Sequence, residues 1–207
     1  MKITHFGHAC LLVEVDGTRI LFDPGTLSAD FEGLRDLDAI LVTHDHDDHL
    51  DFSRLLPLLA QNPDAVLMSD VGSAAQLPGV HVVRPGDHLD IGGVGVEVVG
   101  GAHEFVYLDV PDTPNVGYVL DSGAFFHPGD SFFIPDASVD ILALPTSGPW
   151  LRVSDAADYV NAISPRIAVP MHEAALADTS THYGMLAAFS PDGTAFTPLE
   201  HAIPALL

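Results

Sequence analysis

The stretch that decides the fold of this 207-residue chain is Thr43-His44-Asp45-His46-Asp47-Asp48-His49, which carries three imidazoles and three carboxylates. The apolar residues 39–42 precede it and predict a buried strand that ends at the cluster. Side chains two positions apart on an extended segment point to the same side, so His44 and His46 can face one ion. The pair Asp48-His49 follows where the chain turns into a helix and is available to a second ion. Imidazole and carboxylate ligands suit Zn²⁺, and also Fe or Mn.

A second interpretation of this stretch is a His- and Asp-rich surface loop that binds metal adventitiously or only solvates a turn. The apolar run Ile40-Leu41-Val42 leads directly into it and argues against an exposed tail. The motif and its context therefore favour a functional metal site.

The composition narrows the classes of partner. The 29 Asp and Glu outnumber the 7 Lys and Arg, which gives a net charge of −22 with His neutral. Such a surface repels phosphate groups, so we expect neither nucleic acid nor an anionic membrane as a partner. Cys10 is the single cysteine and excludes an internal disulfide. Because Glu14 interrupts the apolar residues 9–15 and no stretch is long enough to span a bilayer, we expect a cytoplasmic protein.

The rest of the chain alternates short apolar runs with Gly, Pro and Asp. The turn Asp16-Gly17 predicts a hairpin of residues 10–15 and 19–22. Helical spacing predicts helices over residues 50–60, with Asp51 or Ser53 as the cap, and over 71–76, 154–163 and 182–189. Further strands are expected over residues 66–68, 80–83, 94–99, 116–120, 124–127, 141–144 and 167–169. This order predicts two packed sheets with helices outside them, in a single domain that covers residues 1–207.

Four further motifs follow the same order as in a known family. With Thr43-His44-x-His46-x-Asp48-His49, the chain resembles the metallo-β-lactamase-fold hydrolases along nearly its whole length. The other motifs are Leu21-Phe22-Asp23-Pro24-Gly25, Gly101-Ala102-His103, Pro128-Gly129-Asp130-Ser131 and Val169-Pro170-Met171-His172. The motif around His44 is highly specific, whereas the first, third and fourth are weak alone and gain strength from their order and spacing. Gly7-His8-Ala9-Cys10 and Leu144-Pro145-Thr146 resemble the subgroup that contains ascorbate-6-phosphate lactonase and many uncharacterised metal-dependent hydrolases.

The resemblance implies an α+β fold, the four-layer αββα sandwich of the metallo-β-lactamase type, with a binuclear site at one edge. It implies two divalent metal ions, with Zn²⁺ as the main expectation and Mn or Fe as alternatives. The implied ligands are His44, His46 and His103 for the first ion, Asp48, His49 and His172 for the second, and Asp130 as the bridge between them. Asp23 is expected either to support the metal loop or to cap the turn at Pro24-Gly25, with equal weight.

These residues predict a hydrolase that cleaves an ester, lactone or phosphoester bond of a small molecule. A metal lowers the pKa of bound water from about 15.7 towards 7, and a bridging hydroxide is the expected nucleophile. Asp48 is expected to orient that hydroxide as well as to bind the second metal ion. The alternatives are a metal-binding or sensor protein without catalysis, a diiron redox enzyme and a nuclease on the same fold. The oligomeric state stays open, with a homo-oligomer among the options.

His8 and His182 are the candidate catalytic residues beyond the ligands. The resemblance places His8 beside the site, where it binds substrate or donates a proton, and a buried hydrogen-bonded His is the competing interpretation. His182 begins a late helix whose N-terminus either faces the cavity or is only structural. Trp150 and Arg152 share a loop that either clamps an anionic substrate or holds a surface ion pair.

Overall fold

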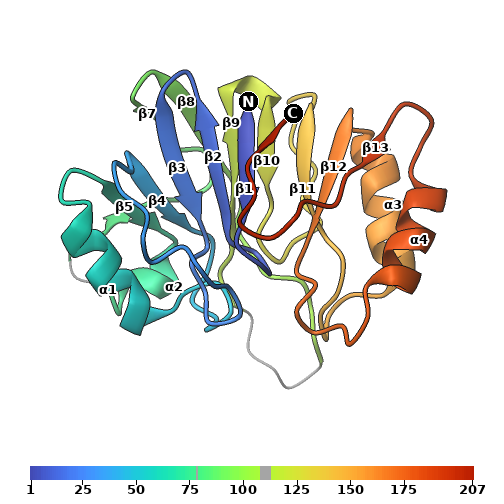
Figure 1. Ribbon diagram of the computed structural model, residues 1–207, viewed down its shortest axis with the longest axis horizontal. Helices are drawn as coiled ribbons and strands as arrows, with labels where there is room; N and C mark the ends of the chain where they lie inside the picture. The colour runs from blue at the N-terminus through green and yellow to red at the C-terminus, as the bar shows by residue number, and fades with distance from the viewer. Residues whose placement is uncertain (78, 108–112) are drawn as a thin grey trace.

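The computed structural model describes residues 1–77, 79–107 and 113–207. Within them the strands form two seven-stranded sheets that pack face to face (Figure 1). The first sheet has the order β14 (Ala205–Leu206), β1 (Lys2–His5), β2 (Leu11–Val15), β3 (Thr18–Phe22), β4 (Ala39–Val42), β5 (Val66–Ser69) and β6 (His81–Val82). The second has the order β13 (Ala195–Phe196), β12 (Ile167–Met171), β11 (Ile141–Pro145), β10 (Phe125–His127), β9 (Val116–Leu120), β8 (Val94–Gly100) and β7 (His88–Ile91).

Helices cover the two outer faces. The helices α1 (Phe52–Gln61) and α2 (Val71–Ala74) lie outside the first sheet, and α3 (Val153–Ile163) and α4 (Ser180–Phe189) lie outside the second (Figure 1). A short 3₁₀ turn, η1 (Asp121–Gly123), connects β9 to β10. The predicted αββα sandwich is therefore confirmed. No helix of the described ranges is both long enough and apolar enough to cross a membrane.

Many strands are apolar throughout because their side chains alternate between two faces of the sheet that are both buried. In β4, Ala39 and Leu41 join the central cluster between the sheets, whereas Ile40 and Val42 join the cluster under α1. In β9, Tyr118 lies in the central cluster and Val119 packs with residues of α3. Strands in the middle of each sheet thus bury both faces, which requires a continuous apolar run rather than alternation.

The structure adds two strands that the sequence pattern did not predict. One is β1, which pairs with β2 and β14 and brings the two chain ends together, and the other is β7, which pairs with β8. Both are only four residues long and of mixed polarity, so their pairing partners decide their conformation. Asp51 is the cap of α1, since its side chain accepts hydrogen bonds from the backbone N–H groups of Ser53 and Arg54.

The strand directions bring the motif residues to one edge of the sandwich. In the first sheet β3 and β4 are parallel, and they end just before Asp23 and Thr43. In the second sheet β10, β11 and β12 are parallel, and β8 runs in the same direction because both β8 and β10 are antiparallel to β9. The loops after β8, β10 and β12 carry His103, Asp130 and His172. Loops at the carboxyl ends of strands are the usual place of a ligand site in such folds.

Candidate metal centre

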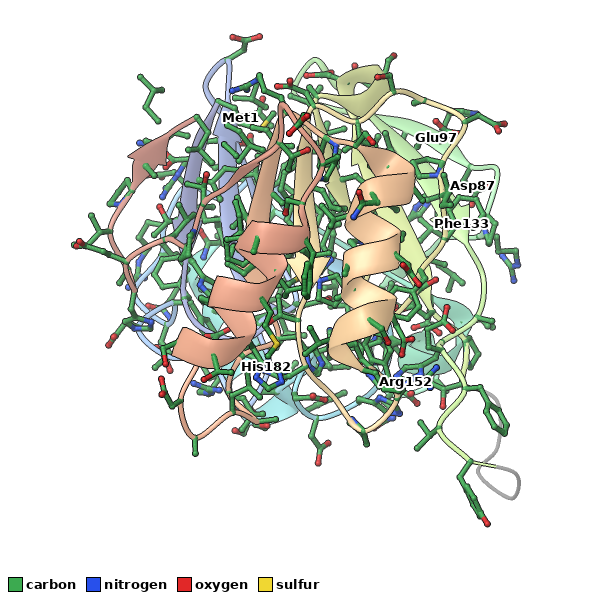
Figure 2. All side chains as sticks on the ribbon, turned by 90° about the vertical axis from the view of Figure 1, so that its right-hand side faces the viewer. Met1, Asp87, Glu97, Phe133, Arg152 and His182 are labelled. Carbon is green, nitrogen blue, oxygen red and sulfur yellow. The ribbon has the colours of Figure 1, made fainter. Side chains whose placement is uncertain are left out.

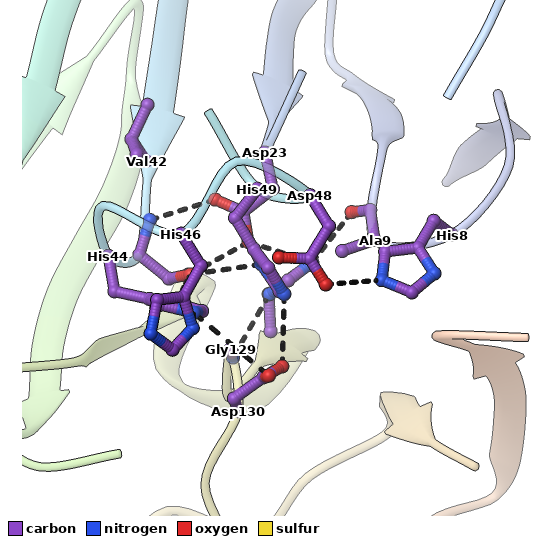
Figure 3. A network of polar contacts seen from close by, with 12 residues as sticks. His8, Ala9, Asp23, Val42, His44, His46, Asp48, His49, Gly129 and Asp130 are labelled. Carbon is purple, nitrogen blue, oxygen red and sulfur yellow. Dashed lines mark hydrogen bonds and ion pairs between the residues drawn. The ribbon is translucent and has the colours of Figure 1, made fainter. Parts of the chain in front are cut away.

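The structure brings all seven nominated side chains into two neighbouring groups. One potential ligand atom from each member of a group lies within 4.8 Å of those of the others. The first group is His44, His46, His103 and Asp130, and the second is His8, Asp48, His49 and His172. Figure 3 shows the residues of the metal loop and Asp130 facing one another across the two sheets. His44, His46 and His103 fall in one group and Asp48, His49 and His172 in the other, as the resemblance implies, while Asp130 falls in the first group and His8 is an addition to the second.

Asp130 lies between the two groups. Its Oδ2 is 3.2 Å from Nε2 of His103 in the first group and 3.2 Å from Nε2 of His172 in the second. Its Oδ1 is 3.0 Å from Nε2 of His49. The carboxylate is almost fully buried, so these contacts form in a medium of low dielectric. Asp130 therefore contacts histidines of both groups.

His8 joins the second group through Asp48 and His172. Nε2 of His8 lies 2.9 Å from Oδ2 of Asp48, and the rings of His8 and His172 are 3.9 Å apart between centroids. Both histidines have positive φ angles, and the backbone N–H of His172 donates to the carbonyl of His8 at 2.9 Å. The carboxylate of Glu173 accepts from the backbone N–H of His8 at 3.0 Å. These bonds tie the start of the chain to the loop after β12.

Asp23 supports the metal loop, residues 43–49 after β4. It is fully buried and accepts hydrogen bonds from the backbone N–H and the hydroxyl of Thr43, each at 2.8 Å. Its Oδ2 also lies 2.7 Å from Nδ1 of His49. An Nδ1–H that donates to a carboxylate leaves Nε2 free as a ligand atom, which is the usual arrangement behind a metal-binding His. Of the two roles that the sequence left open for Asp23, the contacts favour support of the loop.

Gly25 allows the metal loop to pass close to the turn after β3. A Cβ placed at Gly25 would lie 1.8 Å from the carbonyl oxygen of Asp48 and 2.6 Å from the backbone nitrogen of His49. Neither atom can move without displacing the loop. We therefore expect Gly25→Ala to lower the free energy of unfolding by about 1–3 kcal/mol, as overpacking does, and to weaken metal binding.

The matched control for this prediction is Gly33→Ala, because a Cβ at Gly33 has no neighbour within 4 Å. Urea unfolding and metal titration of both variants measure the two effects. Equal stabilities and equal metal affinities of the two variants would contradict the role assigned to Gly25.

The carboxylates and the burial set the protonation of the imidazoles. Burial lowers the pKa of His44, His46 and His8, which favours the neutral form that ligates metal. Burial also opposes the charge of His49, but the Asp130 and Asp23 carboxylates outweigh it and hold the pKa of His49 well above its usual value. A cation that binds the second group must therefore displace a proton from His49.

The donor set fits divalent cations. Several buried atoms of the cluster lie close together without the alignment of a hydrogen bond: Nε2 of His49, His103 and His172, and Oδ1 of Asp130. An unsatisfied buried polar atom costs about 1–3 kcal/mol. Cations between these nitrogen and oxygen atoms would satisfy them, and imidazole with carboxylate is a ligand set that suits Zn²⁺.

Three contacts around the cluster had no signature in the sequence. The side chain of Asn115 accepts from the backbone N–H of Asp130 at 3.0 Å and donates to the carbonyl of Pro128 at 2.9 Å, which fixes the loop after β10. The indole N–H of Trp150 donates to Oδ2 of Asp130 at 2.9 Å. No motif spacing relates Asn115 or Trp150 to Asp130, so only the tertiary structure reveals these contacts.

The remaining candidates lie outside the cluster. His182 stands in the first turn of α4, at the same end of the helix layer as Arg152 (Figure 2). In the described parts of the chain, no hydrogen bond or ion pair joins His182 to a residue of the two groups. Arg152 is largely exposed and pairs with Asp155, the arrangement expected of a surface ion pair. Both residues nevertheless lie on the edge that carries the cluster.

A sequence model of the beta-lactamase superfamily domain matches residues 2–172, a range that includes every residue of the two groups. The chain belongs to the beta-lactamase superfamily. Within this superfamily it is similar to protein Rv0786c of Mycobacterium tuberculosis, with 42% identity over 98% of this chain and 99% of that protein. It is also similar to the UPF0173 metal-dependent hydrolase MK1542 of Methanopyrus kandleri, with 30% identity over 83% of this chain and 84% of that protein.

Solved structures of other proteins share the fold. A metal-dependent hydrolase candidate from Parabacteroides distasonis has a TM-score of 0.79 and 28% identity, over 95% of this chain and 91% of that one. Igni18, a metallo hydrolase from Ignicoccus hospitalis, has a TM-score of 0.75 and 20% identity, over 100% of this chain and 98% of that one. At that identity the likeness to Igni18 concerns the fold alone.

Proposed function

We propose that the protein is a metal-dependent hydrolase with a binuclear centre, which cleaves an ester, lactone or phosphoester bond of a small molecule. The observation that carries the proposal is the pair of four-residue donor groups on either side of the buried Asp130 carboxylate. His44, His46 and His103 would hold one ion, Asp48, His49 and His172 the other, and Asp130 both. Divalent ions there would supply Lewis acidity and lower the pKa of a water from about 15.7 towards 7.

The chain's own residues orient the reaction. Asp48 is the most accessible carboxylate of the cluster, with 29% of its side chain exposed, so it can accept a hydrogen bond from an attacking water and orient that water. His8 contacts Asp48, and burial lowers the pKa of His8 and so favours its neutral form, which suits it to take up a proton or to serve as a further ligand. Of the remaining donors, four are buried and two, His46 and His103, are half-buried.

A neighbouring cavity offers space for the body of the substrate. Its volume is about 480 Å³, and Trp150, which contacts Asp130, forms part of its wall. Phe132 and Tyr159 give it aromatic surface, and Glu104 and Arg152 give it charged groups of both signs. A cavity of this size accommodates a small molecule. We propose small-molecule substrates, and neither nucleic acid nor a membrane as a partner.

The test combines metal analysis with a substrate screen. We expect purified protein to bind two equivalents of Zn²⁺ or Mn²⁺ and to hydrolyse a member of a panel of lactones, phosphodiesters and carboxylic esters, with a rate that follows metal occupancy. Stoichiometric binding without hydrolysis of any member would favour a metal-binding or sensor protein. Absence of stoichiometric metal in the wild type would overturn the proposal.

The two candidate histidines differ in their expected effects. His8→Ala is expected to lower kcat by about 100-fold, because general acid–base groups contribute on that order. His182→Ala is expected to raise KM and to leave kcat within about threefold, the pattern of a substrate contact outside the chemical step. Steady-state kinetics on the substrate from the screen, with metal content measured for each variant, checks both. An unchanged kcat of the His8 variant at full metal content would contradict its role.

A further inference from the structure

Trp150 is the single tryptophan of the chain and contacts both donor groups. Its side chain is 8% exposed, and it lies on the loop between β11 and α3. The ring meets His103 of the first group edge-on, with 5.7 Å between centroids, and His172 of the second group in the same way at 6.0 Å. The indole N–H donates to Oδ2 of Asp130 at 2.9 Å. This residue therefore reaches the centre of the site although it belongs to neither group.

The oxygen that Trp150 contacts is the one that both groups share. Oδ2 of Asp130 faces His103 and His172, whereas Oδ1 faces His49. Asn115 fixes the backbone of Asp130 but not the plane of its carboxylate. The terminal torsion of an Asp side chain is broad, so the plane needs a separate restraint. A donor on Oδ2 supplies that restraint.

We propose that Trp150 is a positioning residue, whose indole N–H holds the carboxylate of Asp130 in the plane that serves both metal positions. The inference rests on the proposed binuclear centre. An indole N–H is a donor without a lone pair for a metal and does not ionise, so it orients the carboxylate without competing for the cation. The aromatic ring also forms part of the wall of the 480 Å³ cavity beside the centre.

A purely structural role for Trp150 is the competing explanation, and a matched pair of variants separates the two. Trp150→Phe removes the N–H and keeps an aromatic ring. Phe132→Leu removes the aromatic neighbour that packs 5.3 Å from Trp150 between ring centroids, and keeps the N–H. Loss of a hydrogen-bond partner of a ligand typically costs about 10–100-fold in metal affinity. We expect this loss for Zn²⁺ in Trp150→Phe and a change within about threefold in Phe132→Leu.

Calorimetric titration with Zn²⁺ measures both affinities, and NMR of the wild type gives a second test that needs no variant. Because there is one tryptophan, protein labelled with ¹⁵N in tryptophan gives one indole N–H signal. We expect that signal to exchange slowly with solvent and to shift as Zn²⁺ is added, with saturation at the stoichiometry of metal binding. An indole signal that does not respond to bound Zn²⁺, or equal Zn²⁺ affinities of Trp150→Phe and Phe132→Leu, would overturn the inference.

The outcomes also separate this inference from the proposed function. Wild type that binds Zn²⁺ with an unresponsive indole overturns the role of Trp150 alone. Wild type that binds Zn²⁺, shows the indole shift and hydrolyses nothing supports the role of Trp150 and overturns the enzymatic part of the proposed function. Wild type that binds no Zn²⁺ overturns both.

Discussion

Asp130→Ala is expected to abolish binding of the second equivalent of metal and to lower hydrolysis by at least about 10³-fold. The magnitude follows because a Lewis-acid metal supplies several kcal/mol of transition-state stabilisation, and each 1.36 kcal/mol is a factor of ten. Asp130 contacts His49, His103 and His172, so its loss removes a shared anion from both groups at once. Elemental analysis and the rate on the substrate from the screen give the two readouts.

The control for this variant is Asp140→Ala. It removes the same charge from the second sheet, but its carboxylate is 45% exposed and pairs with Arg166 outside the site. Exposed ion pairs contribute about 0–1 kcal/mol, so metal content and rate should stay at the wild-type level. An Asp130 variant that keeps two metals and the full rate would contradict the bridging position.

Asp23→Ala is expected to give the largest loss of stability, about 3–5 kcal/mol of the free energy of unfolding. Removal of one partner from a buried charged network costs this much, because the groups that remain lose their hydrogen bonds and cannot reach water. The backbone and hydroxyl of Thr43 and the ring of His49 would all be left without their acceptor. Metal affinity should fall by about 10–100-fold as well, since His49 loses the group that orients it.

Urea unfolding measures this effect, and Asp36→Ala is the matched control. Asp23 and Asp36 both have positive φ angles, 42° and 55°, but Asp36 is exposed. The control should therefore lose only the cost of alanine in the left-handed region, on the order of 1 kcal/mol. Equal losses in the two variants would show that backbone conformation, and not the buried network, makes Asp23 important.

The sequence predicted most of the middle strands because they bury both faces and read as apolar runs. The residues 39–42 and 116–120 coincide with β4 and β9. Short edge strands escaped prediction, as β1 and β7 show, because four residues of mixed polarity have no conformation of their own without a partner strand. The late helix begins at Ser180, two residues before the predicted start, because the periodicity of apolar side chains does not mark the ends of a helix.

The sequence alone determined the fold and nominated the seven donors. The spacing in residues 43–49 after an apolar strand indicated four of them, and the resemblance of short motifs to the family implied His103, Asp130 and His172. Tertiary structure alone decided what surrounds them. The contact between His8 and Asp48 joins residues 40 positions apart, and that between Trp150 and Asp130 joins residues 20 apart. No spacing rule encodes such pairs, since they arise only where loops that follow different strands meet at one edge of the sandwich.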